Sequence, residues 1–160
     1  SSSMRQEMST LVIIACGKKK VWERFPHAGK VRAADAYTGA PFRVNRQYAE
    51  TSGSAWMILS AKYGYIEPGM LIENYNVSFW EEASNPIKLK SLVKQVKDKG
   101  LFQFDVIVGL GGLVYRKMLA DSFAPFKHSI EFPFAGLPVG KAMRAVKKAL
   151  SCHKKGFFRF

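Results

Sequence analysis

Lysine and glycine residues follow the first apolar run of this 160-residue chain, in the segment Cys16-Gly17-Lys18-Lys19-Lys20. Glycine lets the backbone approach a ligand closely, and lysine ammonium groups supply point charges for phosphate. We therefore interpret Cys16, Gly17, Lys18 and Lys20 as candidate ligand-binding residues. A solvated basic loop is the alternative, because runs of charge are common on protein surfaces.

A second group of polar and aromatic residues follows the next apolar run. It consists of Ser60, Lys62, Tyr63, Gly64 and, further along the chain, Tyr75. Tyrosine rings offer stacking faces for a base, while the serine and lysine add a hydroxyl group and a positive charge. Tyrosines in a loop rich in glycine and proline also pack such loops down, so both interpretations stay open.

A third group is the turn Gly109-Leu110-Gly111-Gly112, which leads into a predicted helix and is typical of a phosphate-binding turn. Gly109, Gly111 and Gly112 are its candidate binding residues. The dinucleotide fingerprint does not fit, because Val114 stands where that pattern needs a small residue. Residues 136–141 have one residue too few between their glycines for a P-loop, which disfavours classical nucleoside-triphosphate hydrolysis.

Positive charge dominates the chain, with 25 lysine and arginine residues against 12 acids and a formal net charge of +13. Lys141, Arg144 and Lys148 fall on one face of a predicted helix, where they could follow a line of phosphates. Lys90, Lys94 and Lys97 do the same on another helix. We therefore expect nucleic acid or a phosphorylated small molecule as the partner.

Catalytic and metal-binding signals are weaker. If the protein is an enzyme, Asp35, Glu67 and Glu131 are the candidate general acids or bases. The three histidines are scattered, so we expect neither a metal site nor a cofactor. Two cysteines, Cys16 and Cys152, give no disulfide framework and fit a reducing cytoplasm. A packed, inert thiol is favoured over a nucleophile for Cys16.

The elements that must position these residues alternate between strand and helix. Buried strands are predicted at residues 11–16, 55–60 and 104–109, with a fourth at His128–Phe132, and helices at 38–50, 85–99, 113–121 and 136–150. This order predicts an α/β fold, a three-layer Rossmann-like domain with a mainly parallel sheet of about four strands flanked by helices. Ligands of such sheets bind beyond the carboxyl ends of the strands, so the three groups should meet at one rim.

The length and composition suit a single domain spanning residues 1–160. The longest apolar run, Leu11–Cys16, is far shorter than the roughly 20 residues that cross a bilayer, so no membrane partner is expected. Ser1–Ser3 ahead of Met4 look like an addition made for expression, and residues 1–8 are expected to be a disordered N-terminus. Residues 152–160 form a basic aromatic tail that either docks on the domain or is a mobile arm.

The pattern Ser60-x-x-Tyr63-Gly64-x-Ile66-x-Pro68-x-x-x-Ile72-x-x-Tyr75 resembles the signature of the YaaA peroxide-stress protein family. Three further segments resemble more closely a family of short, uncharacterised microbial relatives of YaaA: Cys16-Gly17-Lys18-Lys19-Lys20, Asp35-x-Tyr37-Thr38-Gly39-x-x-Phe42 and Gly136-Leu137-x-x-Gly140. YaaA proteins are longer and carry a serine and a single lysine in the first turn.

The resemblance implies an α/β fold, a cytoplasmic location, DNA binding and a role in oxidative stress. It also implies a shared pocket built from Lys18, Ser60, Tyr63, Gly64 and Tyr75, with Tyr37 and Thr38 as further ligand-binding residues.

Three functions follow as hypotheses. The first is a nucleic-acid- or nucleotide-binding protein, either without a reaction or as an enzyme acting on a base or its glycosidic bond, with Lys18, Lys20 and Gly111 at phosphate and Tyr63 and Tyr75 at the base. The second is a non-catalytic DNA-binding stress protein that uses only its basic helices. The third is a protein-interaction module.

Overall fold

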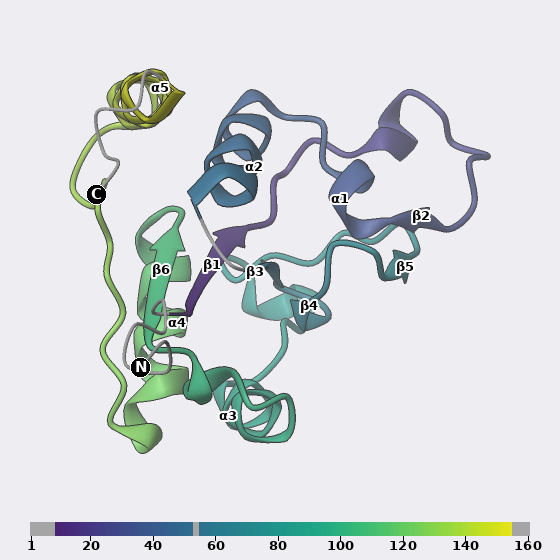
Figure 1. Cartoon of the computed structure of the whole chain (residues 1–160). Coiled ribbons are helices and arrows are strands. Elements are labelled where there is room, and N and C mark those ends of the chain that lie inside the picture. The colour runs from purple at the N-terminus through teal and green to yellow at the C-terminus, as the bar shows by residue number, and fades with distance from the viewer. Residues whose placement is uncertain (1–8, 53–54, 155–160) are drawn as a thin grey trace, which may run out of the picture.

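A four-stranded sheet forms the centre of the protein in the computed structural model, which describes residues 9–52 and 55–154. Its strands are β1 (Thr10–Ala15), β3 (Ala55–Ser60), β4 (Gly64–Ile66) and β6 (Val106–Leu110), in the order β4-β3-β1-β6. β1 is parallel to both β3 and β6, whereas β4 is antiparallel to β3. The sheet is shown in Figure 1 and confirms the predicted α/β fold with a mostly parallel sheet.

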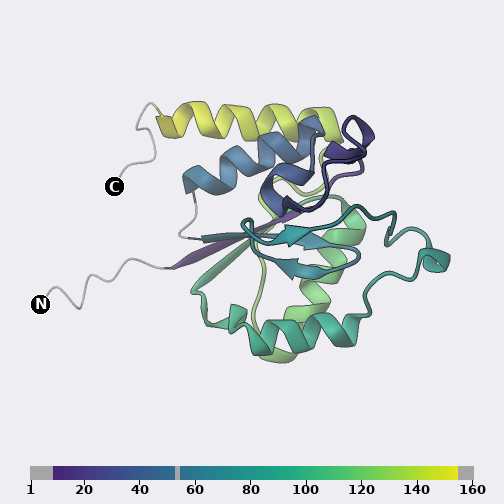
Figure 2. The same ribbon diagram turned by 90° about the vertical axis from the view of Figure 1, so that its right-hand side faces the viewer.

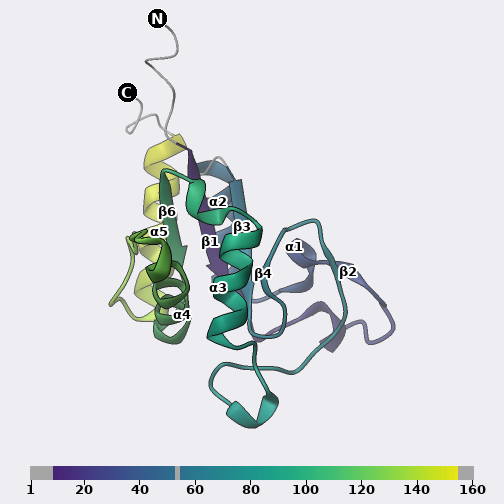
Figure 3. The same ribbon diagram turned by 90° about the horizontal axis from the view of Figure 1, so that it is seen from below.

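Helices cover both faces of the sheet, which gives three layers (Figure 2). α2 (Ala40–Ser52) and α5 (Val139–Lys154) lie on one face, and α3 (Leu89–Asp98) and α4 (Leu113–Phe123) lie side by side on the other (Figure 3). The alternation of side chains along β1 explains this arrangement, because a fully buried strand must supply apolar groups to both faces. Val12 and Ile14 belong to the core beneath α2, whereas Leu11 and Ile13 belong to the core above α3 and α4.

A smaller unit lies beyond β4 (Figure 1). It contains the antiparallel pair β2 (Val31–Arg32) and β5 (Leu71–Ile72) together with the short helix α1 (Ala33–Ala36). Four single-turn 3-10 helices complete the described elements: η2 (Val21–Glu23), η3 (Glu82–Ser84), η4 (Leu101–Gln103) and η5 (Ala124–Phe126). Ile72 is buried in the same core as Val12, so the unit packs on the sheet domain.

The fourth strand differs from the prediction. The segment His128–Phe132 forms only one isolated parallel bridge, between Glu131 and Val108, at the outer edge of β6. The sheet gains its fourth strand at Gly64–Ile66 instead, by a hairpin from β3. Three residues give too short a pattern of alternation to be recognised in a sequence.

Two helices, α3 and α5, begin four and three residues later than predicted. Asn85 has a left-handed backbone with φ of 59°, and the amide of Ile87 donates to the carbonyl of Ala61, so the chain is extended until α3 begins at Leu89. α5 begins at Val139 and continues to Lys154, which places the first three residues of the predicted tail in a helix. The rest of that tail and residues 1–8 lie outside the described residues. No helix in the described part of the chain has the length and apolar content needed to cross a membrane.

Candidate ligand-binding crevice

The carboxyl ends of β1 and β6 form a topological switch point. The chain leaves β1 toward α2 on one face of the sheet and leaves β6 toward α4 on the other face (Figure 2). Residues of the two departing loops line cavities at this point. The two strands approach closely at this point. A Cβ atom placed on Gly111 would lie 2.6 Å from the Cβ atom of Ala15, so only glycine fits there.

Two adjoining cavities occupy this end of the molecule. The larger has a volume of about 280 Å³ and lies among the turn after β6, the start of α4 and the wall formed by Phe134 and α5. The smaller, of about 170 Å³, lies between the loops that follow β1 and β6. They share four lining residues, Pro41, Asn45, Gly111 and Gly112, so we treat them together as the crevice.

The crevice is electropositive. The first turns of α2, α4 and α5 border it through Pro41, Gly112 and Pro138, and none of these turns contains an acidic residue. The amino end of a helix concentrates partial positive charge and unpaired backbone amides. Gly112, the N-cap of α4, supplies no side-chain cap to those amides. The helix ends therefore favour an anion.

Arg116 adds a full positive charge. It lies one turn into α4 and is the only charged residue among the described residues that line the two cavities. Its Nε atom is buried and has no hydrogen-bond partner within the described part of the chain. A buried donor without a partner is costly, and rotation of the guanidinium toward a bound oxygen atom would satisfy it.

The remaining walls are apolar and aromatic. Phe134, Met143 and Val146 line the larger cavity, and Phe42, Trp80 and Tyr115 line the smaller one. Trp80 is 67% exposed, which leaves most of its indole ring accessible at the mouth of the crevice. A site with one cation, several free amides and flat apolar walls suits a ligand that joins an anionic group to an aromatic ring.

Cys16 and Tyr115 face each other in the smaller cavity, with the thiol sulfur 3.3 Å from the phenolic oxygen. Burial raises the pKa of the Tyr115 phenol, and the nearby Cys16 thiol raises it further. The phenol is therefore protonated at neutral pH and can donate a hydrogen bond into the crevice.

The predicted tyrosine site is a packed hydrogen-bonded chain beside the crevice. Ser60 Oγ accepts hydrogen bonds from the amides of Lys62 and Tyr63, both at 3.1 Å, and donates to the hydroxyl of Tyr75 at 3.0 Å. The Tyr75 and Tyr37 hydroxyl oxygens are 2.6 Å apart. Ser60, Tyr37 and Tyr75 are all buried, so these groups position the loop after β3.

The residues that flank this hydrogen-bonded chain are more exposed to solvent. Tyr63, which is half-buried, packs edge-on against Tyr75 with ring centroids 5.6 Å apart. Lys20 and Lys62 approach the same Tyr75 ring, with their Nζ atoms 4.6 Å and 6.0 Å from its centroid. Gly64 is buried on the other side, where an added Cβ would lie 2.3 Å from the side-chain oxygen of Gln95 on α3.

The structure brings some of the predicted site residues into the crevice and leaves others outside it. Cys16, Gly17, Gly109, Gly111 and Gly112 line the cavities. Lys18 and Thr38 are exposed near the loop after β1, where the amide of Thr38 donates to the carbonyl of Lys19.

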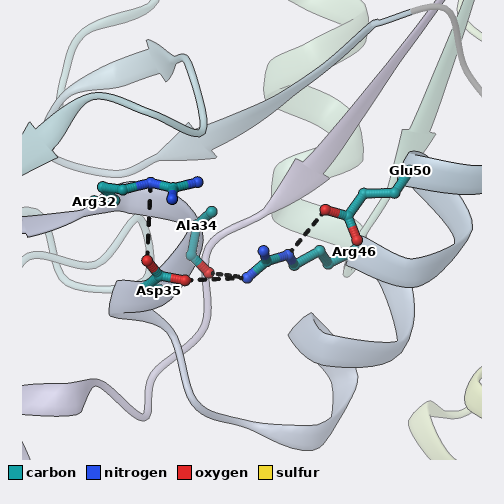
Figure 4. Close-up of polar contacts among 5 residues, drawn as sticks. All are labelled: Arg32, Ala34, Asp35, Arg46 and Glu50. Carbon is teal, nitrogen blue, oxygen red and sulfur yellow. Dashed lines mark hydrogen bonds and ion pairs between the residues drawn. The ribbon is translucent and has the colours of Figure 1, made fainter.

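The three candidate catalytic carboxylates do not line the crevice. Asp35 forms ion pairs with Arg32 and Arg46 at 3.8 and 3.5 Å, as Figure 4 shows. Glu67 and Glu131 are exposed. The backbone of Glu131 pairs with β6, which is the reason for its position at the sheet edge.

The predicted basic residues differ in their ion pairing between α5 and α3. Lys141, Arg144 and Lys148 are exposed on α5 and form no ion pair among the described residues. On α3, Lys94 pairs with Asp98 at 2.7 Å, which neutralises part of that stripe.

Sequence reasoning missed Arg116, Asn45 and Trp80. Arg116 could have been found, because it lies one helical turn after Gly112 and side chains three or four residues apart share a helix face. Asn45 reaches the crevice from α2, and nothing in its local sequence distinguishes it. Trp80 is an exposed tryptophan in a segment without regular structure, and such a residue is a signal for binding.

These features define an open-sheet α/β protein with an electropositive crevice at its switch point. The chain belongs to the family described as "Family of unknown function (DUF6884)", whose model matches residues 11–148. It is 36% identical over 145 residues to the uncharacterized protein YfjM of Bacillus subtilis (strain 168), a match that covers 89% of this chain and 96% of that protein. No solved structure matches the chain.

Proposed function

We propose that this protein binds a nucleotide in the crevice between the ends of β1 and β6. The observation on which the proposal rests is Arg116, the one charged residue among the described lining residues, with a buried and unpartnered Nε atom. The proposal keeps the cytoplasmic location expected from the cysteine content. It assigns no reaction to Asp35, Glu67 or Glu131, because all three lie outside the crevice.

The phosphate would lie at the turn between β6 and α4. There the amides that begin α4 and the guanidinium of Arg116 can donate to the same group of oxygens. Gly111 and Gly112 carry no side chains that would hold the phosphate away from the backbone. No lining carboxylate competes for the site among the described residues.

The base would lie against the aromatic walls. Trp80 presents an exposed indole face at the mouth of the crevice, and Tyr115 offers a protonated hydroxyl in the same cavity. Stacking of a base on an aromatic side chain contributes roughly 1–3 kcal/mol. Both halves of a nucleotide therefore find a suitable surface in one connected site.

Titration calorimetry with a set of nucleoside 5′-monophosphates and their unphosphorylated nucleosides tests the proposal. At least one monophosphate should bind, and the matching nucleoside should bind at least tenfold more weakly. Arg116→Gln should weaken binding of the monophosphate by about 10- to 100-fold, because a hydrogen bond to a charged group is worth roughly 1.5–3 kcal/mol. Bound base should also quench the fluorescence of Trp80, and Trp80→Phe should abolish that change.

Lys117→Gln is the matched control, since it removes one positive charge from the next position of α4, where the side chain is exposed and outside the cavities. It should change the affinity less than twofold. Equal affinity of the wild-type protein and Arg116→Gln would contradict the proposal, as would the absence of binding by every nucleotide.

A second candidate function, DNA binding along α5, is favoured by the exposed and unpaired charges of Lys141, Arg144 and Lys148. This second function would include the stress role implied by the resemblance to YaaA proteins. Replacing all three residues with glutamine should abolish binding to duplex DNA and leave the nucleotide titration unchanged. The same charge removed from α3 and its N-cap by Lys88→Gln, Lys90→Gln and Lys97→Gln provides the control.

A further inference from the structure

Two ammonium groups approach one aromatic ring outside the crevice. Lys20 Nζ lies 4.6 Å and Lys62 Nζ 6.0 Å from the centroid of Tyr75, and Lys62 Nζ is also 5.2 Å from the centroid of Tyr63. The two lysines come from different loops, one after β1 and one after β3. Two like charges held near one ring repel each other, and a bound anion between them would relieve that repulsion.

These charges are not neutralised by the described residues. None of the ion pairs within residues 9–52 and 55–154 involves Lys20 or Lys62. Glu23 is the acidic side chain in contact with Lys20, but its carboxylate accepts from the backbone amide at 2.9 Å and thereby caps η2. The ammonium groups have the tyrosine rings as partners.

Tyr75, with Ser60 and Tyr37 that hold its hydroxyl group, forms a rigid platform for the two lysines. The Tyr75 ring is fixed by its hydroxyl, which lies in the buried chain between Ser60 and Tyr37. Lys20 is held by an antiparallel backbone bridge to Tyr37, and the amide of Lys62 donates to Ser60. Because the backbone at both lysines is already ordered, binding an anion would require ordering of the lysine side chains but not of the backbone.

The platform borders the crevice through Phe42. This residue lines the smaller cavity and packs on Tyr37, with ring centroids 5.0 Å apart. The hydroxyl oxygen of Tyr37 in turn lies 2.6 Å from that of Tyr75. The tyrosines that hold the lysine pair therefore adjoin the wall of the crevice.

We propose that Lys20 and Lys62 form a second anion-binding point, which takes a second phosphate group of the nucleotide bound in the crevice. This inference rests on the proposed function. The second phosphate has two sources, a further phosphate of a small nucleotide or the next phosphodiester of a single strand. Both present the same tetrahedral oxyanion to the lysine pair.

Titration of the full-length protein with three related ligands tests the inference. These are a nucleoside 5′-monophosphate, the corresponding 3′,5′-bisphosphate and the 5′-phosphorylated dinucleotide. The wild-type protein should bind one or both of the ligands with two phosphates at least tenfold more tightly than the monophosphate. A gain only for the dinucleotide identifies a strand as the source, whereas a gain for the bisphosphate identifies a terminal phosphate.

The double variant Lys20→Gln, Lys62→Gln should remove this tenfold gain and leave the affinity for the monophosphate within twofold of wild type. The control variant Lys19→Gln, Lys30→Gln removes the same charge from exposed positions and should keep the gain. Equal binding of ligands with one and two phosphates would overturn the inference and leave the proposed function intact. Failure of all three ligands to bind would overturn both.

Discussion

Arg46 holds Asp35, one of the three candidate catalytic acids or bases, in an ion pair. Its guanidinium donates to the carbonyl oxygen of Ala34 at 2.8 Å and lies 3.5 Å from Asp35 and 3.3 Å from Glu50 (Figure 4). It also lies 5.9 Å from the centroid of the Trp56 ring. Arg46 thereby joins α1, α2 and β3, and Asp35 serves as one of its partners.

Replacing Arg46 should cost more stability than replacing its acidic partner. Arg46→Met loses a charged hydrogen bond to a buried segment, so the free energy of unfolding should fall by about 1–3 kcal/mol. Asp35→Asn breaks only exposed ion pairs and should cost roughly 0–1 kcal/mol. Urea denaturation measures both values, with the exposed Arg43→Met as control. Similar losses for Asp35→Asn and Arg46→Met would show that the ion pair dominates.

Single residues could be predicted from the sequence only where the backbone itself makes the site. Cys16, Gly111 and Gly112 were predicted at the crevice because they directly follow strands whose ends must share an edge. The burial of Tyr75 could not be foreseen, since its hydroxyl partner Tyr37 is 38 positions away along the chain. Trp80 reaches the crevice from a segment without periodicity, so no pattern places it there.

The junction between β6 and α4 is the element on which the crevice depends. Gly111 permits the contact between the ends of β1 and β6, and Gly112 opens α4 without a side-chain cap. The two glycines differ in their surroundings, since an added Cβ on Gly112 would meet no atom within 4 Å. The absence of a side chain is therefore required for packing at Gly111, whereas at Gly112 it leaves room for a ligand.

Alanine substitutions at these two positions should separate stability from binding. Gly111→Ala forces β1 and β6 apart and should lower the free energy of unfolding by about 1–3 kcal/mol. Gly112→Ala should change stability by less than about 0.5 kcal/mol. Its methyl group narrows the site for phosphate, so it should weaken nucleotide binding. Thermal unfolding and calorimetry measure the two effects, and equal stability of the two variants would contradict the argument.

Strands were predicted correctly where the apolar run in the sequence was long and buried. The three parallel strands were recognised from apolar stretches such as residues 55–60, which match β3 at both ends. The start of α3 was placed too early because Pro86 is a common helix-opening residue, while the extended backbone at Ile87 depends on a hydrogen bond to Ala61. Such a tertiary contact leaves no mark on the local sequence.

At the scale of the whole molecule, three buried tyrosines and one part-buried tyrosine make stability depend on alkaline pH. Burial raises the pKa values of Tyr37, Tyr65, Tyr75 and Tyr115 above the usual value near 10. These phenols stay neutral in the folded state while they ionise in the unfolded chain. Their stabilising contribution is therefore complete below about pH 10 and is lost as the pH rises above that value.

The free energy of unfolding should consequently fall steeply between about pH 10 and 11, by up to about 1.4 kcal/mol per pH unit for each tyrosine. Tyr65→Phe should reduce this slope by one such contribution, even though it lowers stability at neutral pH by removing the hydrogen bond to Ser122. Urea denaturation across this pH range measures the slope. An identical slope in wild type and Tyr65→Phe would refute the linkage.

The wall formed by α5 is anchored separately from the sheet. Val146 and Leu150 pack with Val44 of α2 in a third small core, distinct from the two cores that hold the strands. Met143, which faces the larger cavity, borders only this third core, whereas Phe134 also packs against the core that holds β1. The part of the cavity wall at Met143 can thus diverge among homologues, or be randomised in a library, while the strand scaffold keeps its own interior unchanged.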